Sequence, residues 1–350
     1  MILIFGEGLL HMAPEEEAMK KYVRGLLLFS LWFFITERGV AIAQSQKLRV
    51  AWVAVGGAMA PVWIAYDLNL YKRYGLNAEL VYVGGSTLAT RALLTGDLDI
   101  TMNSGLSVVN AAGTGASDIV LIAGISNVLP FYLMAKSGLK ASDLKGKVIA
   151  TDKPGTATYH ALIVALKHLN LSPRDIRIAP VGSPPTALST MQQGLVDAGI
   201  LSPPMSFRAE SLGFQNLVDI ASLGIYSQGA CVTTTRRFIR DRREEVLNFM
   251  RALVAGIHVY KTDRDAALRV LEKYTQIRDR QILERTRRYY AEKIIAQFPY
   301  ATKEGLQAVI EDQAAISPAS GSVNVDRLID NSFLTELERS AFVQTLSDAL

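Results

Sequence analysis

Short apolar runs alternate with amphipathic segments over most of the chain. The runs are four to eight residues long and apolar positions at helical spacing lie between most of them, as expected for buried strands joined by helices. Because alternating strands and helices build parallel sheets, this pattern predicts an α/β fold. The expected strands are Leu48–Val55, Ala78–Val83, Leu98–Met102, Ile119–Ala123, Lys147–Ala150, Ile176–Val181, Ala198–Leu201 and Ala230–Thr234.

Two stretches of this pattern match each other at a constant offset of 98 residues, without gaps. Each reads strand, glycine loop, helix, strand, glycine loop, helix, glycine and strand. The repeat predicts two similar α/β lobes, and a cleft between two lobes is a favoured ligand site. The matches are Val50 with Val148, Gly57 with Gly155, Val83-Gly84 with Val181-Gly182, Gly96 with Gly194, Asp99 with Asp197, and Ser104 with Ser202.

After Thr235 the pattern becomes helical. We expect these helices to form a layer that packs on one lobe or braces both. The segments with helical spacing are Asp241–Thr262, Asp265–Thr275, Arg280–Ile295, Lys303–Ile316 and Val325–Ile329.

The N-terminal region has the features of an export signal. Lys20, Lys21 and Arg24 precede an apolar stretch at 25–35, and Ala41-Ile42-Ala43 follows as a cleavage site. The stretch is about half of the roughly 20 residues that a spanning helix needs, so a cleaved leader is favoured over an anchor. Three glutamates at 15–17 are unusual before a signal peptide and favour Met19 as the start. We therefore predict a signal-peptide region at 1–43, cleavage after Ala43 and a periplasmic location.

Composition and charge exclude several classes of protein. The chain has 350 residues, 49% of them hydrophobic and 20% charged, which indicates a globular core and excludes disorder. The net charge of +4, without a dense basic stripe, argues against nucleic acid as a partner. The one cysteine, Cys231, cannot form an internal disulfide or a cysteine-based metal site, and its apolar surroundings predict a core residue.

Residues for catalysis or metal binding are not grouped in any known motif. His160 and His168 are two helical turns apart, too far for a metal-binding pair, and no nucleophile or phosphate-loop motif occurs. We therefore predict no catalytic residue, no metal, no cofactor and no enzymatic activity. Asp99 and Asp197 each enter a strand after a glycine, and we interpret both as structural.

Six loops rich in Gly, Ser and Thr follow the strands and would meet at the cleft. Glycine lets a backbone approach a ligand, Ser and Thr cap helices, and the free N–H groups of a helix start favour an anion or polar oxygen. The loops are Gly56–Pro61, Gly84–Thr87, Asn103–Gly105, Lys153–Tyr159, Gly182–Pro185 and Ser202–Pro204.

Four phrases in and around these loops resemble a known family. They are GGAMAPVWIA, YKRYGLNAELVYVGGSTLATRALLTGDLDI, LKGKVIATDKPGTATYHALIVALKHLNL and MQQGLVDAGILSPP. These phrases resemble the periplasmic binding proteins for nitrate, taurine, aliphatic sulfonates and thiamine pyrimidines. The match covers residues 47–235 well and the helical tail loosely.

The resemblance implies a type II periplasmic-binding-protein fold, with two α/β lobes, a central cleft and a C-terminal helical layer. It places the first part of lobe 1 at 44–126, lobe 2 at 127–224, and the return to lobe 1 with the C-terminal helices at 225–350. Crossovers near Ile125–Pro130 and Leu223–Gly229 would act as the hinge. The implied ligand contacts are Gly57, Ala58, Met59, Ser86, Asn103, Ser104, Asn127, Thr156, Thr158, Tyr159, Ser202 and Gln228.

The resemblance further implies a function: capture of a small sulfonate-, nitrate- or pyrimidine-like solute by a monomer that delivers it to an ABC permease. The loops carry no arginine, so an anion would depend on Lys153 and helix N-termini. Met59, Trp63, Phe131, Tyr159 and Tyr226 could instead line a pocket for a heterocycle. Two alternatives stay open: a thiamine-pyrimidine biosynthesis-type enzyme on the same fold, and a sensory protein that docks to a membrane receptor.

Overall fold

The computed structural model describes residues 47–314 and 318–346. The predicted signal peptide at 1–43, with its start at Met19 and its cleavage after Ala43, lies outside the described residues. No helix within the described ranges is long and apolar enough to cross a membrane.

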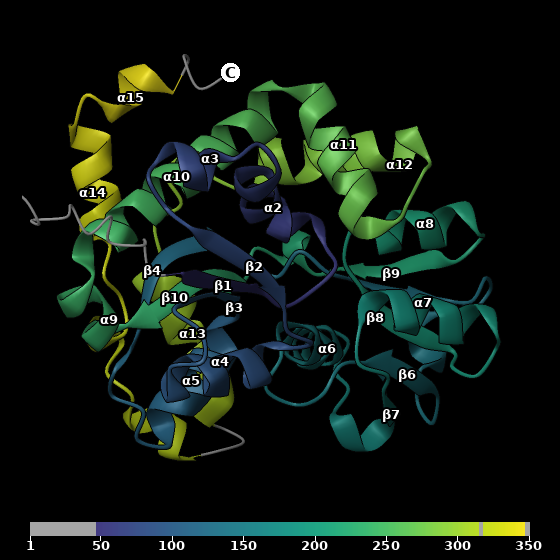
Figure 1. Cartoon of the computed structure of the whole chain (residues 1–350). Helices are drawn as coiled ribbons and strands as arrows, with labels where there is room; N and C mark the ends of the chain where they lie inside the picture. The colour runs from purple at the N-terminus through teal and green to yellow at the C-terminus, as the bar shows by residue number, and fades with distance from the viewer. Residues whose placement is uncertain (1–46, 315–317, 347–350) are drawn as a thin grey trace, which may run out of the picture. The chain divides into compact units, whose positions relative to one another are not determined.

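Ten strands form two five-stranded sheets with the same plan (Figure 1). In the first sheet β1 is parallel to β2 and β3, while β10 runs antiparallel between β3 and β4. Its order is β2 (Ala78–Tyr82), β1 (Leu48–Trp52), β3 (Ile100–Asn103), β10 (Ala230–Thr235) and β4 (Ile119–Ser126).

The second sheet repeats this arrangement with later strands. Here β6 is parallel to β7 and β8, and β5 runs antiparallel between β8 and β9. The chain enters this sheet after Ser126 and returns to the first sheet at Ala230. Its order is β7 (Arg177–Pro180), β6 (Val148–Thr151), β8 (Ala198–Leu201), β5 (Tyr132–Ala135) and β9 (Gln215–Asp219).

All eight expected strands are present, and β5 and β9 were not predicted from the sequence. Strand β5 is only four residues long and sits directly after the first crossover, so its short apolar run reads as part of that connection. Strand β9 is an edge strand in which one residue, Val218, is fully buried, so it lacks the apolar run that identifies a central strand.

The sequence repeat is confirmed as a structural repeat, but its register needs a one-residue correction. Arg49 pairs with Glu79, whereas Val148 pairs with Arg177, so Arg49 and not Val50 corresponds to Val148. The second and third strands keep the offset of 98. The first strand is offset by 99, because the connection from β6 to β7 is one residue shorter than that from β1 to β2.

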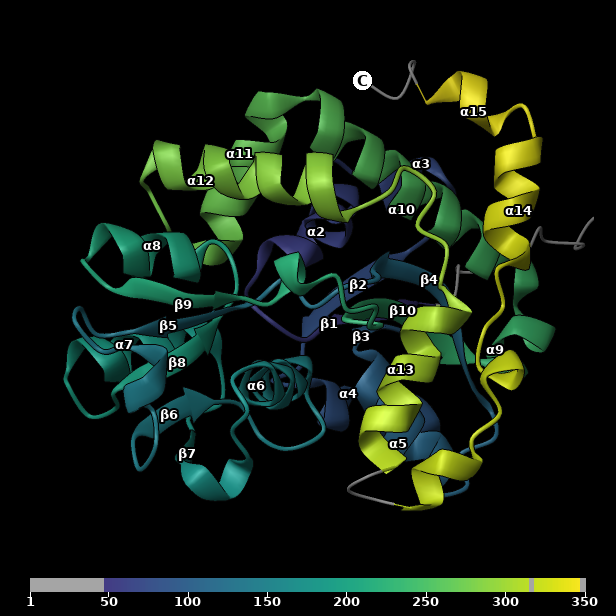
Figure 2. The same cartoon turned by 180° about the vertical axis from the view of Figure 1, so that it is seen from behind.

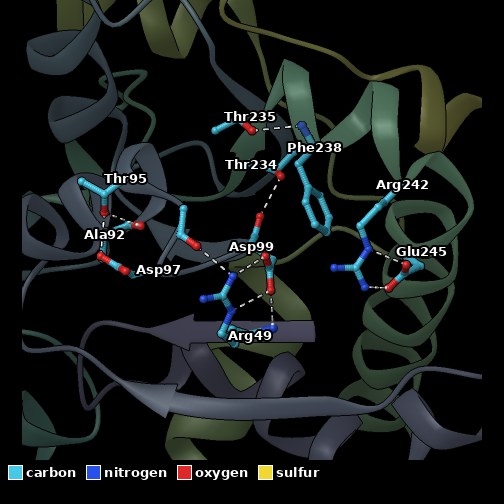
Figure 3. A network of polar contacts seen from close by, with 11 residues as sticks. Arg49, Ala92, Thr95, Asp97, Asp99, Thr234, Thr235, Phe238, Arg242 and Glu245 are labelled. Atoms are coloured by element: carbon cyan, nitrogen blue, oxygen red, sulfur yellow. Dashed lines mark hydrogen bonds and ion pairs between the residues drawn. The ribbon is translucent and has the colours of Figure 1, made fainter. Parts of the chain in front are cut away.

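Asp99 and Asp197 do the same structural work in the two lobes, as predicted. The Asp99 carboxylate accepts the Arg49 backbone N–H at 2.7 Å and two guanidinium bonds from the same residue (Figure 3). The Asp197 carboxylate accepts the Val148 N–H at 3.0 Å and faces Lys136 at 3.4 Å. Each carboxylate thus ties the third strand of its sheet to the first.

Helices cover both faces of the first sheet (Figures 1 and 2). One face packs against α2 (Ala60–Asp67), α3 (Leu70–Arg73), α10 (Arg243–Thr262) and α11 (Arg264–Thr275), and the other against α4 (Ser86–Thr95), α5 (Gly105–Gly113) and α13 (Lys303–Ala314). Around the second sheet lie α6 (Ala157–His168), α7 (Pro184–Gln192) and α8 (Met205–Ser211).

The helical tail packs mainly on the first lobe and also touches the second. After α9 (Arg236–Asp241), α10 and α11 come α12 (Arg280–Arg288), a π-helical turn (Tyr289–Ile294), α13, α14 (Ser332–Arg339) and α15 (Phe342–Thr345). Arg285 of α12 pairs with Glu210 of α8 and lies 3.8 Å from the ring centre of Phe207. The predicted helix at Val325–Ile329 is wrong beyond a 3₁₀ turn at Val325–Arg327, because Ile329 joins β4 through a bridge to Leu121.

Candidate functional site

A cavity lies where the carboxyl ends of strands from both sheets meet. It encloses about 600 Å³ of space free of protein atoms, including its opening to solvent. Loops after β1, β3 and β6 and the starts of α4 and α6 form most of its wall. The lining residues are Val53, Ala54, Gly56, Ala58, Met59, Gly85, Ser86, Asn103, Ser104, Pro130, Phe131, Asp152, Thr156, Ala157, Thr158, Pro184, Ser202, Gly229, Ala230 and Tyr290.

Most of the residues predicted as ligand contacts are brought together here. Residues from all six predicted loops, three in each lobe, meet in one lining, as the repeat suggested. Those that line the cavity are Ala58, Met59, Ser86, Asn103, Ser104, Thr156, Thr158 and Ser202. Their contact with a ligand stays a prediction.

Four predicted residues lie outside this lining. Gly57 packs under Tyr290, so closely that a Cβ at Gly57 would overlap the ring. Asn127 donates from Nδ2 to the Tyr300 carbonyl at 3.0 Å, and Gln228 donates from Nε2 to the carbonyls of Ser126 and Ala230. Both side chains thus hold the crossover segments in place. From residue type and position in the sequence, this role could not be distinguished from ligand contact.

Tyr159, the fourth, faces a second cavity beside the first. This space of about 950 Å³, including its opening, lies between helices α4 and α5 and the loop that precedes α6. Its lining is mostly hydroxyl and amide groups: Thr87, Thr90, Arg91, Leu94, Ser107, Asn110, Ala111, Thr114, Pro154, Gly155, Tyr159 and Gln313.

Asn103 has its side-chain amide fully engaged inside the first lobe. Nδ2 donates to the hydroxyls of Thr90 at 2.9 Å, Thr233 at 3.2 Å and Thr101 at 3.3 Å. Oδ1 accepts the Ser104 N–H at 2.9 Å and the Ser107 hydroxyl at 2.5 Å. Asn103 therefore shapes the loop that faces the cavity, and its amide has little left to offer a ligand.

Two helices present free backbone N–H groups at the cavity. The first turn of a helix has N–H groups without intrahelical partners. Helix α4 begins after Gly85, which has no side chain to cap it, so the turn at Ser86 keeps its donors. At α6 the Thr156 hydroxyl accepts the Tyr159 N–H at 3.3 Å. The backbone N–H groups of Ala157 and Thr158 remain without an intrahelical partner. Such donors favour a polar or anionic oxygen.

Asp152 is the one formally charged side chain among the described residues that line the cavity, and that lining contains no Lys, Arg or His. It follows Thr151, the last residue of β6, and its Oδ1 accepts the Lys153 N–H at 2.6 Å. Burial is the main cause that raises the pKa of the Asp152 carboxyl, and the Lys153 backbone bond opposes it. Sequence analysis did not identify Asp152 as a site residue, because an acid beside a lysine at a strand end is common on surfaces.

Tyr290 is a second lining residue that sequence analysis missed. It belongs to the π-helical turn at Tyr289–Ile294, far along the chain from the predicted loops. Its hydroxyl interacts with Ser202, and burial raises the pKa of the phenol. Turns of this kind are frequent at functional sites, but they have no sequence signature that could have identified this one.

The two lobes touch directly around the cavity. The Gly57 N–H donates to the Pro203 carbonyl at 3.2 Å. On the other side, His160 of α6 lies 3.1 Å from the Asp312 carboxylate of α13, and Lys167 lies 3.6 Å from it. The described conformation is therefore one in which the lobes are in contact.

The part of the chain that the structure describes contains no group of residues arranged for metal binding or for thiol chemistry. No cluster of three or more His, Cys, Asp or Glu side chains occurs there. Cys231 lies in β10 in the first lobe's core, where burial raises the pKa of its thiol. This position fits the predicted packing role.

Comparison with known proteins finds one family and many related structures. The family described as NMT1/THI5 like matches residues 57–267. A Brachyspira hyodysenteriae protein named as an ABC transporter periplasmic binding protein is 23% identical over 94% of this chain and 98% of its own. The taurine-binding periplasmic protein of Escherichia coli is 24% identical over 67% of this chain and 73% of its own.

A solved structure agrees with the fold. The alkanesulfonate-binding protein SsuA from Xanthomonas axonopodis pv. citri, bound to MOPS, superposes with a TM-score of 0.65 at 22% identity. The alignment covers 83% of this chain and 96% of that one. The two-sheet architecture thus has the predicted type II periplasmic-binding-protein topology.

Proposed function

The chain belongs to the NMT1/THI5-like family, and from that premise we propose that it is the solute-binding component of an ABC importer. It captures a small molecule in the cavity between the two sheets and delivers it to a membrane permease. The observation that carries this proposal is the cavity itself, because strand ends of both sheets contribute to one lining. Relatives named as periplasmic binding proteins support the transport role and an exported location.

Capture proceeds by hinge closure. The strands at 48–126 and 230–235 form one sheet and those at 132–219 the other, so only two segments connect the lobes. Rotation about these segments would separate the Gly57 N–H from the Pro203 carbonyl and open the cavity. The contacting lobes described above represent the closed state, with lobe 1 at 44–126 and 225–350 and lobe 2 at 127–224.

The finer parts of the proposal concern processing, assembly and chemistry. The chain is cleaved after Ala43, acts as a monomer in the periplasm, and releases its ligand unchanged. The lining supports the last point, because its described residues include no second carboxylate and no Lys or His with which Asp152 could share proton transfer. N-terminal sequencing and light scattering of the exported protein test the first two.

Mass spectrometry of the purified protein tests the central proposal. Protein exported to the periplasm and purified without added solute should release a small molecule on denaturation. The same compound, added back to the stripped protein, should raise the melting temperature by several degrees and be recovered with unchanged mass. A stripped protein whose melting temperature is unmoved by its own extract and by a broad metabolite panel contradicts the capture role.

A further inference from the structure

The ligand cavity combines one carboxylate with a lining free of basic side chains among the described residues. Lobe 2 supplies the carboxylate, Asp152, at the end of β6. Lysine 153 follows it in sequence, but its side chain is exposed and outside the lining. Backbone N–H groups at helix starts can bind an anion without a positive side chain, but a carboxylate in the same lining opposes a bare anion.

The second oxygen of Asp152 is available to a ligand. Its Oδ1 accepts the Lys153 backbone N–H at 2.6 Å, and Oδ2 has no hydrogen-bond partner among the described residues. The charge of the exposed Lys153 side chain partly offsets the burial of Asp152, and a carboxylate that is partly removed from water still favours a ligand that donates to it. An ionised carboxylate can only accept hydrogen bonds, so the missing partner must be a donor.

Besides Asp152, the polar groups of the lining are mainly backbone N–H donors and hydroxyls, set among apolar side chains. Backbone N–H groups at the starts of α4 and α6 can bind ligand oxygens, and Ser86, Thr158 and Ser202 carry hydroxyls. The cavity therefore presents one strong acceptor against several donors for oxygen. A ligand that matches this arrangement carries a nitrogen donor at one position and polar oxygens or ring acceptors elsewhere.

We propose that Asp152 selects ligands that carry a hydrogen-bond-donating nitrogen, an amine or an amino- or imide-bearing heterocycle, and rejects anions without such a group. This inference rests on the proposed solute capture and adds the residue that decides the ligand class. Repulsion from Asp152 disfavours nitrate and simple alkanesulfonates, and a charge-assisted N–H···O bond favours the donor ligand.

Matched pairs of compounds that differ only in the donor group test the inference on the full mature protein. The pairs are taurine and ethanesulfonate, 4-aminopyrimidine and 4-methylpyrimidine, and 9-methyladenine and 9-methylpurine, with nitrate as the simplest anion. Calorimetry and thermal shift should show tighter binding of a donor member than of its partner, by about ten- to a hundredfold. The ligand released from purified protein should likewise contain an N–H donor.

Asp152→Asn and Asp219→Asn form a matched pair of variants. Asp219 is a half-buried acid of the same lobe whose pKa is also raised by burial, but it lies outside the cavity lining. Asp152→Asn should abolish the preference for the donor member, whereas Asp219→Asn should keep it. A circular dichroism spectrum and melting curve like those of the parent protein show that each variant is folded.

The outcomes separate this inference from the proposal on which it rests. Equal binding within every pair, an unchanged preference in Asp152→Asn, or a released ligand without an N–H donor overturns the role of Asp152 and leaves solute capture intact. A protein that releases no ligand and binds neither the panel nor its own extract contradicts capture and the selectivity with it.

Discussion

The buried side-chain amide of Asn103 has five hydrogen-bond partners, and these bonds give the residue a structural role. Three threonine hydroxyls accept from it, and the backbone of Ser104 and the hydroxyl of Ser107 donate to it. Its position at the end of β3 suggested a ligand contact, which stays a prediction. The contacts show that its amide also holds the following loop in place.

Asn103→Ala should therefore lower the stability of the protein more than it changes which ligands the protein binds. Loss of the amide leaves several buried polar groups unpaired, and we expect about 2–4 kcal/mol less free energy of unfolding. Urea denaturation of the variant and the parent protein measures this difference in the free energy of unfolding. Asn127→Ala, which removes one bond to the Tyr300 carbonyl, should cost about 1 kcal/mol. Similar losses in the two variants would contradict the network interpretation.

The two strand-tying aspartates should differ in their contribution to stability. Asp99 is 8% exposed and takes three bonds from Arg49, while Asp197 is 29% exposed and pairs loosely with Lys136. We expect Asp99→Asn to cost about 2–3 kcal/mol and Asp197→Asn about 1 kcal/mol. Chemical denaturation of both variants checks the order, and a larger loss for Asp197→Asn would refute it.

At the scale of elements, the π-helical turn is the feature that completes the cavity. It turns Tyr290 from the helical tail toward the loops of both lobes, where the ring covers Gly57 and the hydroxyl meets Ser202. Only glycine fits at position 57 beneath this ring, because any Cβ would overlap it.

A double-mutant cycle tests this packing. Gly57→Ala should force the ring of Tyr290 out of place, lower the melting temperature and weaken ligand binding about tenfold or more. Adding Tyr290→Ala should relieve the clash, so the two changes together cost less than the sum of the single changes. Strict additivity in melting temperature and in affinity would show that the two residues do not meet.

Two elements of the sheets also show what local pattern misses. Strand β5 and strand β9 pair with each other and are recognised only by their partners, because one is very short and the other is an edge strand with a single buried residue. The segment at 325–329 has helical spacing of apolar residues, yet its end is held by β4. In each case a long-range partner overrides a weak local preference.

For the whole molecule, the contact between α6 and α13 is positioned to stabilise closure. His160 and Lys167 of lobe 2 face Asp312 of the tail that packs on lobe 1. The hydrogen bond from His160 is the main cause that lowers the pKa of the Asp312 carboxyl. A lowered pKa means that the ionised carboxylate favours the contact, so its stabilisation is lost as the pH falls through that lowered value.

Asp312→Asn should therefore shift the protein toward the open state. Small-angle scattering of the ligand-free variant at neutral pH should give a larger radius of gyration than the parent protein, with several-fold weaker ligand binding. Glu311→Gln is the control, since Glu311 is exposed and bonds only to Gln307 of its own helix. If Asp312→Asn has the same radius of gyration as the parent protein between pH 5 and 8, the contact does not contribute to closure.

Much of the site could be predicted, and the limits of prediction have a common cause. Ser86 and Thr156 stand at helix starts and Ser202 directly follows a strand, so turn chemistry and the repeat placed them at the cavity. Tyr290 comes from a distant turn, and Asp152 from a position that looks like ordinary surface. Neither has a local signal, and their meeting depends on how the tail and the second lobe pack.

The sequence by itself determined the α/β alternation, the two lobes and the loops that form the cavity, because hydrophobic period and turn chemistry act between near neighbours. Tertiary structure alone decided which side chains line the cavity. It bonded the amide nitrogens of Asn103, Asn127 and Gln228 to groups within the protein and left Asp152 as the single charge among the described residues of the lining. Such choices depend on contacts between residues far apart in the chain, and no local pattern contains them.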